Sequence, residues 1–186
     1  MRIYTRRGDD GTTGLLFGGR VRKDEAAIEA CGAVDEAQAA IGAARALAAR
    51  GSELDELLVG LERDLWVLMA EVATAPENRP RLVGGQTAVT TAMVAALEPL
   101  IDQVTARFAA PTEFVIPGQS PLAAALDVAR TVTRRAERRA IPVAPAPADS
   151  FVVPYLNRLS DLLWTLARWQ EDGALPARTP TEEHPS

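Results

Sequence analysis

Three arginines at helical spacing form the most chemically suggestive pattern in this sequence. Arg130, Arg134 and Arg138 follow one another at steps of four, so on a helix their guanidinium groups share one face. The chain has a formal net charge of −5, yet five arginines gather within residues 130–139. Guanidinium binds phosphate through paired hydrogen bonds, so this row favours a phosphate site. The alternative is a solvated helix face that Glu137 partly neutralises.

A second set of anion-binding residue types occupies residues 1–23. Glycines, threonines and cations are packed there into spans that look too short for a helix or a strand. Glycines permit positive φ angles, so successive N–H groups can converge on an anion, with threonine hydroxyls and Lys23 as further donors. This composition suits a triphosphate, although neither G-x-x-x-x-G-K-[ST] nor G-x-G-x-x-G occurs. The alternative is a flexible N-terminal arm.

Composition limits the remaining classes of function. The 186 residues are 47% hydrophobic, which predicts one globular domain over residues 1–173. The start of the chain has no apolar run and no segment has the length of a membrane span, so we expect a cytoplasmic protein without membrane contact. One cysteine, Cys31, and one histidine, His184, exclude a His/Cys metal cluster. The negative net charge disfavours nucleic acid as a partner.

The elements that must position these residues are helices. Apolar residues recur at steps of three and four, with Asp24, Ser52 and Ser120 as N-cap candidates and Pro121 at a first helical position. The predicted helices cover residues 24–50, 52–75, 87–108, 121–142 and 150–173. We therefore expect an all-α, five-helix antiparallel bundle, with an extended connector over 140–150 and a disordered tail over 174–186.

The first predicted helix carries further signals. At 27 residues it would be roughly 40 Å long, and such a helix with several apolar faces indicates that neighbouring chains cover part of it. Within it, Asp35 and Glu36 form an acidic pair beside apolar neighbours. Asp35 could meet an arginine from elsewhere, or simply be exposed. In the second helix, Trp66 and Met69 fit a core or an interface better than a ligand site.

Four segments, in order and over nearly the whole chain to about residue 170, resemble the ATP:corrinoid adenosyltransferases of the propanediol-utilisation type. They are Ile3-Tyr-Thr-Arg-Arg-Gly-Asp-Asp-Gly-Thr-Thr with Lys23-Asp24; Gly32-Ala-Val-Asp-Glu; Phe114-Val-Ile-Pro-Gly with residues 129–138; and Tyr155-Leu-Asn-Arg-Leu-Ser-Asp-Leu-Leu.

This resemblance implies a fold, a reaction and an ATP site. Members are five-helix bundles that form homotrimers, with an active site at each subunit interface. They transfer the 5′-deoxyadenosyl group of ATP to the cobalt of a reduced corrinoid such as cob(I)alamin and release triphosphate. Mg²⁺ is expected to bind through the phosphates rather than through a protein metal site. Carried over by position, the ATP-binding residues would be Thr5, Arg6, Arg7, Gly8, Thr13, Gly14, Lys23, Arg134, Arg135, Glu137, Arg138 and Asn157.

The resemblance also implies roles in catalysis for four residues. Arg134 would be catalytic as well as part of the ATP site, and Arg130 would pair with Asp35 of the partner subunit and help to order the loop. Phe114 matches the aromatic residue that fills the lower face of the corrin and excludes the axial base. A four-coordinate cobalt is easier to reduce and more open to attack. An ordinary core aromatic is the alternative for Phe114.

Five positions depart from the family's usual residues, and two of them, Gln119 and Asp127, fall near the expected corrin pocket. The departures are Arg7 for Thr, Ala27 for Arg, Gln38 for Asn, Gln119 for Gly and Asp127 for His. They leave open a non-catalytic homologue that binds ATP or a corrinoid as carrier or sensor. A purely structural helical module is a third hypothesis, and it would need neither Lys23 nor the glycine-rich loop.

Overall fold

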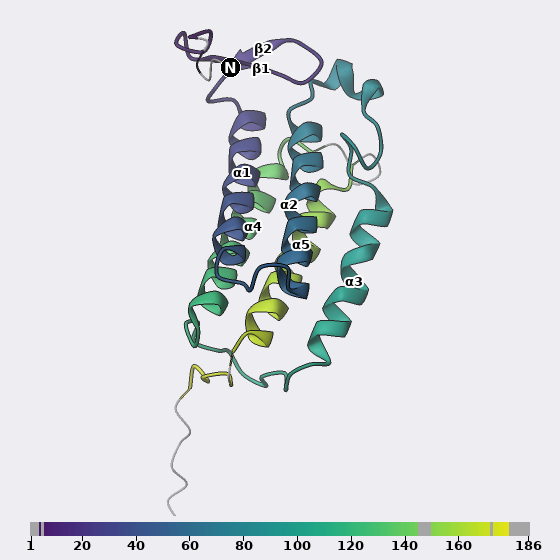
Figure 1. The fold of residues 1–186 in the computed structure, drawn as a ribbon. Coiled ribbons are helices and arrows are strands. Elements are labelled where there is room, and N and C mark those ends of the chain that lie inside the picture. The colour runs from purple at the N-terminus through teal and green to yellow at the C-terminus, as the bar shows by residue number, and fades with distance from the viewer. Residues whose placement is uncertain (1–3, 5, 145–149, 172, 179–186) are drawn as a thin grey trace, which may run out of the picture.

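The fold is known from a computed structural model, which describes residues 4, 6–144, 150–171 and 173–178. The described residues form five α-helices, one 3₁₀ helix and a two-stranded antiparallel sheet (Figure 1). In chain order the elements are β1 (Thr12–Gly14), β2 (Arg20–Arg22), α1 (Ala26–Arg45), α2 (Glu53–Val72), η1 (Pro76–Arg81), α3 (Thr91–Thr105), α4 (Pro121–Ala140) and α5 (Val152–Trp169). The predicted helical bundle is therefore present, together with a small sheet that was not predicted.

Side-chain caps begin three of the helices. Ser52 Oγ accepts a hydrogen bond from Asp55 N, Thr90 Oγ1 from Met93 N, and Ser120 Oγ from Ala123 N, which satisfies backbone donors that a helix start leaves free. The predictions for Ser52 and Ser120 are confirmed.

The predicted start and length of the first helix were wrong. Glu25, not Asp24, precedes α1, because the Asp24 carboxylate is held by the Arg22 guanidinium at 2.8 and 2.7 Å. The helix ends at Arg45 and has 20 residues, so its length is roughly 30 Å instead of 40 Å. After Ala46 the chain turns towards α2, where Asp55 accepts hydrogen bonds from Arg45 Nε and Gly51 N.

The core lies between α1, α2, α4 and α5, and α3 packs against α5. On α5, Leu156, Leu159, Leu163 and Leu166 are all fully buried, as their spacing predicts. The buried faces of α1 and α4 are rich in alanine, including Ala30, Ala33, Ala37, Ala129 and Ala136. Small side chains let helices approach closely, which fixes α4 and its arginines against α1.

The N-terminal region contains a β-hairpin where we expected only a loop. Thr12 pairs with Arg22, and Gly14 with Arg20. The tip of the hairpin is fastened to the end of α2, where Leu16 N donates to Ala73 O at 2.9 Å. Arg81 of η1 lies over the Phe17 ring at 4.4 Å and donates to Phe17 O at 3.1 Å. Contacts with distant segments thus order strands that are only three residues long.

Residues 173–178 also differ from the expected disordered tail. Ile116 N donates to Leu175 O at 2.8 Å, and Ala177 N donates to Phe114 O at 2.7 Å. These bonds form an antiparallel bridge between Val115 and Pro176. The rest of the predicted tail, 179–186, and most of the predicted connector, 145–149, lie outside the described residues. Within the described ranges, no helix combines the length and apolar character needed to cross a bilayer.

Candidate functional site

A cavity of about 740 Å³ opens between α4, α5 and the segment that precedes α4. Phe114 lies on its wall and is 90% exposed, so the alternative of an ordinary core aromatic is wrong. The backbone bond from Ala177 to Phe114 O holds this part of the chain in place. Other lining residues include Asp127, Arg130, Arg134, Asp161, Trp164 and Arg168. An aromatic ring and several guanidinium groups therefore face one space.

The arginines of α4 fall into two groups. Arg135 forms an ion pair with Glu36 of α1, and Arg139 pairs with Glu29 of α1 at 3.7 Å. Arg134 and Arg138 are also exposed, but they form no ion pair with any described residue. Like charges one turn apart repel each other, so this face of α4 is suited to bind an anion.

Glu137 and Asn157, both predicted to belong to an ATP site, lie in contact. Asn157 Nδ2 of α5 donates to Glu137 Oε1 of α4 at 3.1 Å. Glu137 is one residue from Arg138, so the pair borders the arginine face at its C-terminal end. The predicted residues of α4 and α5 are thus brought together by the packing of these two helices.

Arg20 holds the N-terminal loop in shape. Its guanidinium donates to Arg7 O at 2.6 Å and to Thr12 Oγ1 at 3.0 and 2.5 Å. Asp10 Oδ1 accepts hydrogen bonds from Thr12 N and Thr12 Oγ1 at 2.9 and 2.8 Å, and these bonds lower the pKa of Asp10. Neither Arg20 nor Asp10 was among the predicted site residues, although Arg20 holds the backbone of Arg7, which was.

The predicted loop residues are only partly assembled. Lys23 Nζ lies so close to Gly8 that a Cβ at Gly8 would be 3.0 Å from it, which explains why this position suits glycine. Arg6 adopts a φ of 61°, a conformation that is uncommon for a side chain other than glycine. Thr13 and Gly14 lie on β1, and Thr5 lies outside the described residues.

The loop and the arginine face lie at the same end of the bundle. The Arg139–Glu29 pair sets the end of α4 beside the start of α1, which directly follows β2 (Figure 1). Apart from Arg7, the described residues of 6–23 form no hydrogen bond or ion pair with α4. The two groups of predicted phosphate ligands therefore lie near the same end of the fold.

Asp35 and Arg130 do not pair within the chain. Arg130 Nε donates to Asp127 Oδ1 at 2.9 Å instead. Asp35 is exposed on α1 and lines a shallow second cavity with Trp66 of α2. Trp66 is 65% exposed, whereas Met69 is buried in the core. Asp35 thus belongs to an outer face of α1 and α2.

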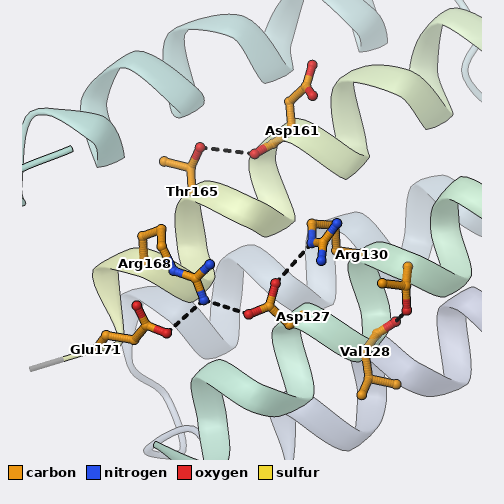
Figure 2. A network of polar contacts seen from close by, with 8 residues as sticks. Asp127, Val128, Arg130, Asp161, Thr165, Arg168 and Glu171 are labelled. Atoms are coloured by element: carbon orange, nitrogen blue, oxygen red, sulfur yellow. Dashed lines mark hydrogen bonds and ion pairs between the residues drawn. The ribbon is translucent and has the colours of Figure 1, made fainter. Parts of the chain in front are cut away.

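A charged cluster that was not predicted as such joins Asp127 and Arg168, which both line the main cavity, to Glu171 (Figure 2). Arg168 Nη2 donates to Asp127 Oδ2 at 2.5 Å and to Glu171 Oε1 at 2.7 Å. The side chains of Arg168, Asp127 and Glu171 are only 2%, 5% and 1% exposed. Asp127 and Arg168 each interrupt a buried helix face of apolar residues. A charged residue on an apolar helix face was the signal in the sequence that could have revealed this cluster, because buried charges usually have a partner of opposite charge.

The other four residues that depart from the family's usual residues lie outside the lining of the main cavity. Gln38 Nε2 donates to Glu62 O at 2.7 Å and so joins α1 to α2. Gln119 is exposed directly after Gly118, which has a φ of 114° that favours glycine. Ala27 is half-buried and Arg7 is exposed. None of these four side chains lines the main cavity.

Neither a reactive cysteine nor a metal site built from protein side chains is found among the described residues. Burial, followed by the nearby Asp35 charge, raises the pKa of the Cys31 thiol, which disfavours the nucleophilic thiolate. Among the described residues, no group of three His, Cys, Asp or Glu side chains could hold a metal ion. The arrangement is suited to bind and orient reactants.

The comparisons with known proteins agree with one another. The family described as cobalamin adenosyltransferase matches residues 3–170. A corrinoid adenosyltransferase of Mycobacterium tuberculosis is 44% identical over 170 residues, covering 90% of this chain and 87% of the relative. A corrinoid adenosyltransferase of Citrobacter freundii is 41% identical over 171 residues, covering 91% of this chain and 95% of the relative.

Solved structures give the same result. A variant of the PduO-type ATP:corrinoid adenosyltransferase from Lactobacillus reuteri, complexed with cobalamin and ATP, superposes with a TM-score of 0.79 at 31% identity, covering 90% of each chain. A second variant of that enzyme, also complexed with cobalamin and ATP, gives a TM-score of 0.83 at 28% identity, covering 96% of this chain and 100% of the other. Sequence and fold together show that this chain belongs to the cobalamin adenosyltransferase family and is of the PduO type.

Proposed function

We propose that this protein transfers the 5′-deoxyadenosyl group of ATP to the cobalt of a reduced corrinoid, cob(I)alamin, and releases triphosphate. One observation supports this reaction above the others. In a chain of this family, an exposed Phe114 and the guanidinium-bearing residues Arg130 and Arg134 border the same cavity. A flat apolar ligand and a polyanion would meet there. The reaction consumes ATP, and we place it in the cytoplasm.

The triphosphate would lie between the N-terminal loop and the arginine face of α4. Gly8 and Lys23 lie in contact, and Arg134 and Arg138 have no carboxylate partner among the described residues. Negative charge on the leaving group grows as the bond to C5′ breaks, and fixed guanidinium groups stabilise that charge. Thr5, Arg6, Arg7, Thr13, Gly14, Arg135, Glu137 and Asn157 would complete the ATP site. Mg²⁺ would be held mainly by phosphate oxygens and water, as this ion commonly is.

The corrinoid would lie against Phe114. Reduced cobalt is itself the nucleophile that attacks C5′, so the protein needs to align the reactants and not to supply a nucleophile. The exposed ring of Phe114 would cover the lower corrin face and exclude the axial base. An aromatic side chain left 90% exposed is available for such a contact.

The site would be completed by a second chain in a homotrimer. Asp35 and Trp66 are exposed on one face of α1 and α2, and a large exposed aromatic residue beside a carboxylate fits a subunit contact. Arg130 would then pair with Asp35 of the partner subunit. This pair would link assembly to the order of the nucleotide loop.

An anaerobic assay with ATP and pre-reduced cobalamin tests the proposed reaction. Adenosylcobalamin is followed by its absorbance, and triphosphate is measured separately. Arg134→Ala should abolish turnover in a protein that still folds, whereas Arg139→Ala should retain it, because Arg139 pairs with Glu29 outside the cavity. Near-normal turnover by Arg134→Ala would refute the assigned role. Calorimetric ATP binding without any product from the wild-type protein would instead favour a carrier or sensor.

A further inference from the structure

The cluster of charged residues in the cavity wall contains charges of alternating sign. Glu171, Arg168, Asp127 and Arg130 follow one another from the end of α5 to the middle of α4 (Figure 2). Each contact is 2.9 Å or shorter. The Arg168 guanidinium also lies 5.7 Å from the Trp164 ring centre, and Trp164 lines the cavity. The cluster therefore connects Arg168, which is almost fully buried, to the more exposed Arg130 in the same cavity wall.

Asp127 divides its two oxygens between two arginines. Oδ2 accepts from Arg168 and Oδ1 from Arg130 Nε. Only the Nε of Arg130 has a partner among the described residues. The two terminal nitrogens of Arg130 therefore remain available to a carboxylate or phosphate.

Stability alone is a weak explanation for this cluster. Buried ion pairs are often no more stable than apolar side chains of the same volume, because desolvation offsets the attraction. Here Arg168 Nε and Glu171 Oε2 are also buried without a partner among the described residues, and an unsatisfied buried group is costly. A role in orienting Arg130 accounts for the cluster better than a role in folding.

From this geometry we infer that Arg168 is a positioning residue, which holds Asp127 so that Arg130 presents its terminal nitrogens to the site. Without Arg168, Asp127 Oδ2 would lose its partner and rotate to capture a second nitrogen of Arg130. The inference deepens the proposed function, because it assigns Arg168 to the proposed pair between Arg130 and Asp35 of the partner subunit. Arg168 uses one nitrogen for both of its bonds, so a lysine ammonium can replace it.

A double-mutant cycle tests this role. Arg168→Met and Asp35→Asn should each weaken ATP binding and lower kcat/KM by about tenfold, and the double variant should lose about tenfold as well, because both changes disable the same pair. A purely structural role for Arg168 predicts independent losses that multiply to about a hundredfold. Multiplying losses would overturn the inference. Arg168→Lys should restore activity to within about threefold of wild type, and failure of this rescue would also overturn it.

Two additions keep the result interpretable. Leu58→Ala removes a fully buried side chain of α2 and should lower stability without lowering kcat/KM; an equal loss there would overturn the inference. If Arg168→Met does not fold, Asp127→Asn/Arg168→Met/Glu171→Gln removes both carboxylates that Arg168 would leave unpaired, and it replaces Arg168→Met in the cycle, with the same two outcomes. ATP affinity is measured by calorimetry. A wild-type protein that binds ATP but makes no product therefore refutes the proposed function. The coupling between Arg168 and Asp35 can still be measured in that case, because it also appears in ATP affinity.

Discussion

Arg20→Ala tests whether the N-terminal loop must be held in shape before ATP binds. Arg20 lies on β2, and its guanidinium bridges the backbone of Arg7 and the hydroxyl of Thr12. The Arg7 carbonyl oxygen and the Thr12 hydroxyl are next to the atoms that we expect to contact phosphate, but are not among them. Its loss should leave the bundle intact and free the loop.

The magnitude follows from hydrogen bonds to three acceptor atoms, Arg7 O, Thr12 O and Thr12 Oγ1, which a side chain that is 46% exposed donates. Exposed charged contacts are weakened by solvent, so we assign each bond about 0.5 kcal/mol. The sum, roughly 1–1.5 kcal/mol, corresponds to a rise of about 5–10-fold in the KM for ATP. The loop would hold the phosphates in both the ground state and the transition state, so kcat should change little.

The assay is steady-state turnover at saturating reduced cobalamin with ATP varied, together with calorimetric ATP binding. Arg22→Ala is the matched control. Arg22 is on the same strand two residues away, but its guanidinium pairs only with Asp24 among the described residues. It should therefore keep the wild-type KM.

Two results would refute this reasoning. If Arg20→Ala and Arg22→Ala give the same KM for ATP within twofold, the bridge does not order the loop. If kcat falls at unchanged KM, Arg20 acts on the transition state rather than on binding.

Three further predictions concern single side chains. Phe114→Ala should change the free energy of unfolding by less than about 0.5 kcal/mol because the ring is exposed. It should leave ATP affinity unchanged but slow turnover when the assay starts from cob(II)alamin plus a reductant. Equal turnover rates in the variant and in wild type would refute the role of Phe114. Burial raises the pKa of the Asp64 carboxyl group, which accepts a hydrogen bond from Tyr155. The contribution of Asp64 to stability is therefore fully present below its pKa in the unfolded chain, about 3.9, and is lost as the pH rises through its higher pKa in the folded protein. In urea titrations, the free energy of unfolding of Asp64→Asn should therefore rise relative to that of wild type between pH 3.5 and pH 7. A difference between the two proteins that does not change with pH would contradict this. Cys31, whose pKa burial raises, should react with iodoacetamide at pH 8 far more slowly in the folded than in the urea-unfolded protein; equal rates would show that the thiol is accessible.

Local rules were sufficient for the helices and for the arginine face. The caps at Ser52 and Ser120 were readable because a hydroxyl three residues before a free N–H satisfies it directly. The spacing of Arg130, Arg134 and Arg138 likewise follows from the helical repeat. Asp24 failed as a cap for a reason outside local helix rules, since Arg22 competes for its carboxylate.

The hairpin could not be predicted from its own residues. Strands of three residues are too short to be stable alone, and β1 and β2 depend on Leu16 and Phe17 meeting Ala73 and Arg81. Those contacts join segments more than fifty residues apart in sequence.

Periodicity and capping act over a few residues, so the sequence was enough to predict a helical bundle with a row of arginines along one helix. Tertiary structure alone decided that Phe114 is exposed on a cavity wall and that Arg168 reaches Asp127, 41 residues away along the chain. A side chain's exposure and a buried charge's partner depend on which helices pack together. No local pattern in either helix specifies that partner.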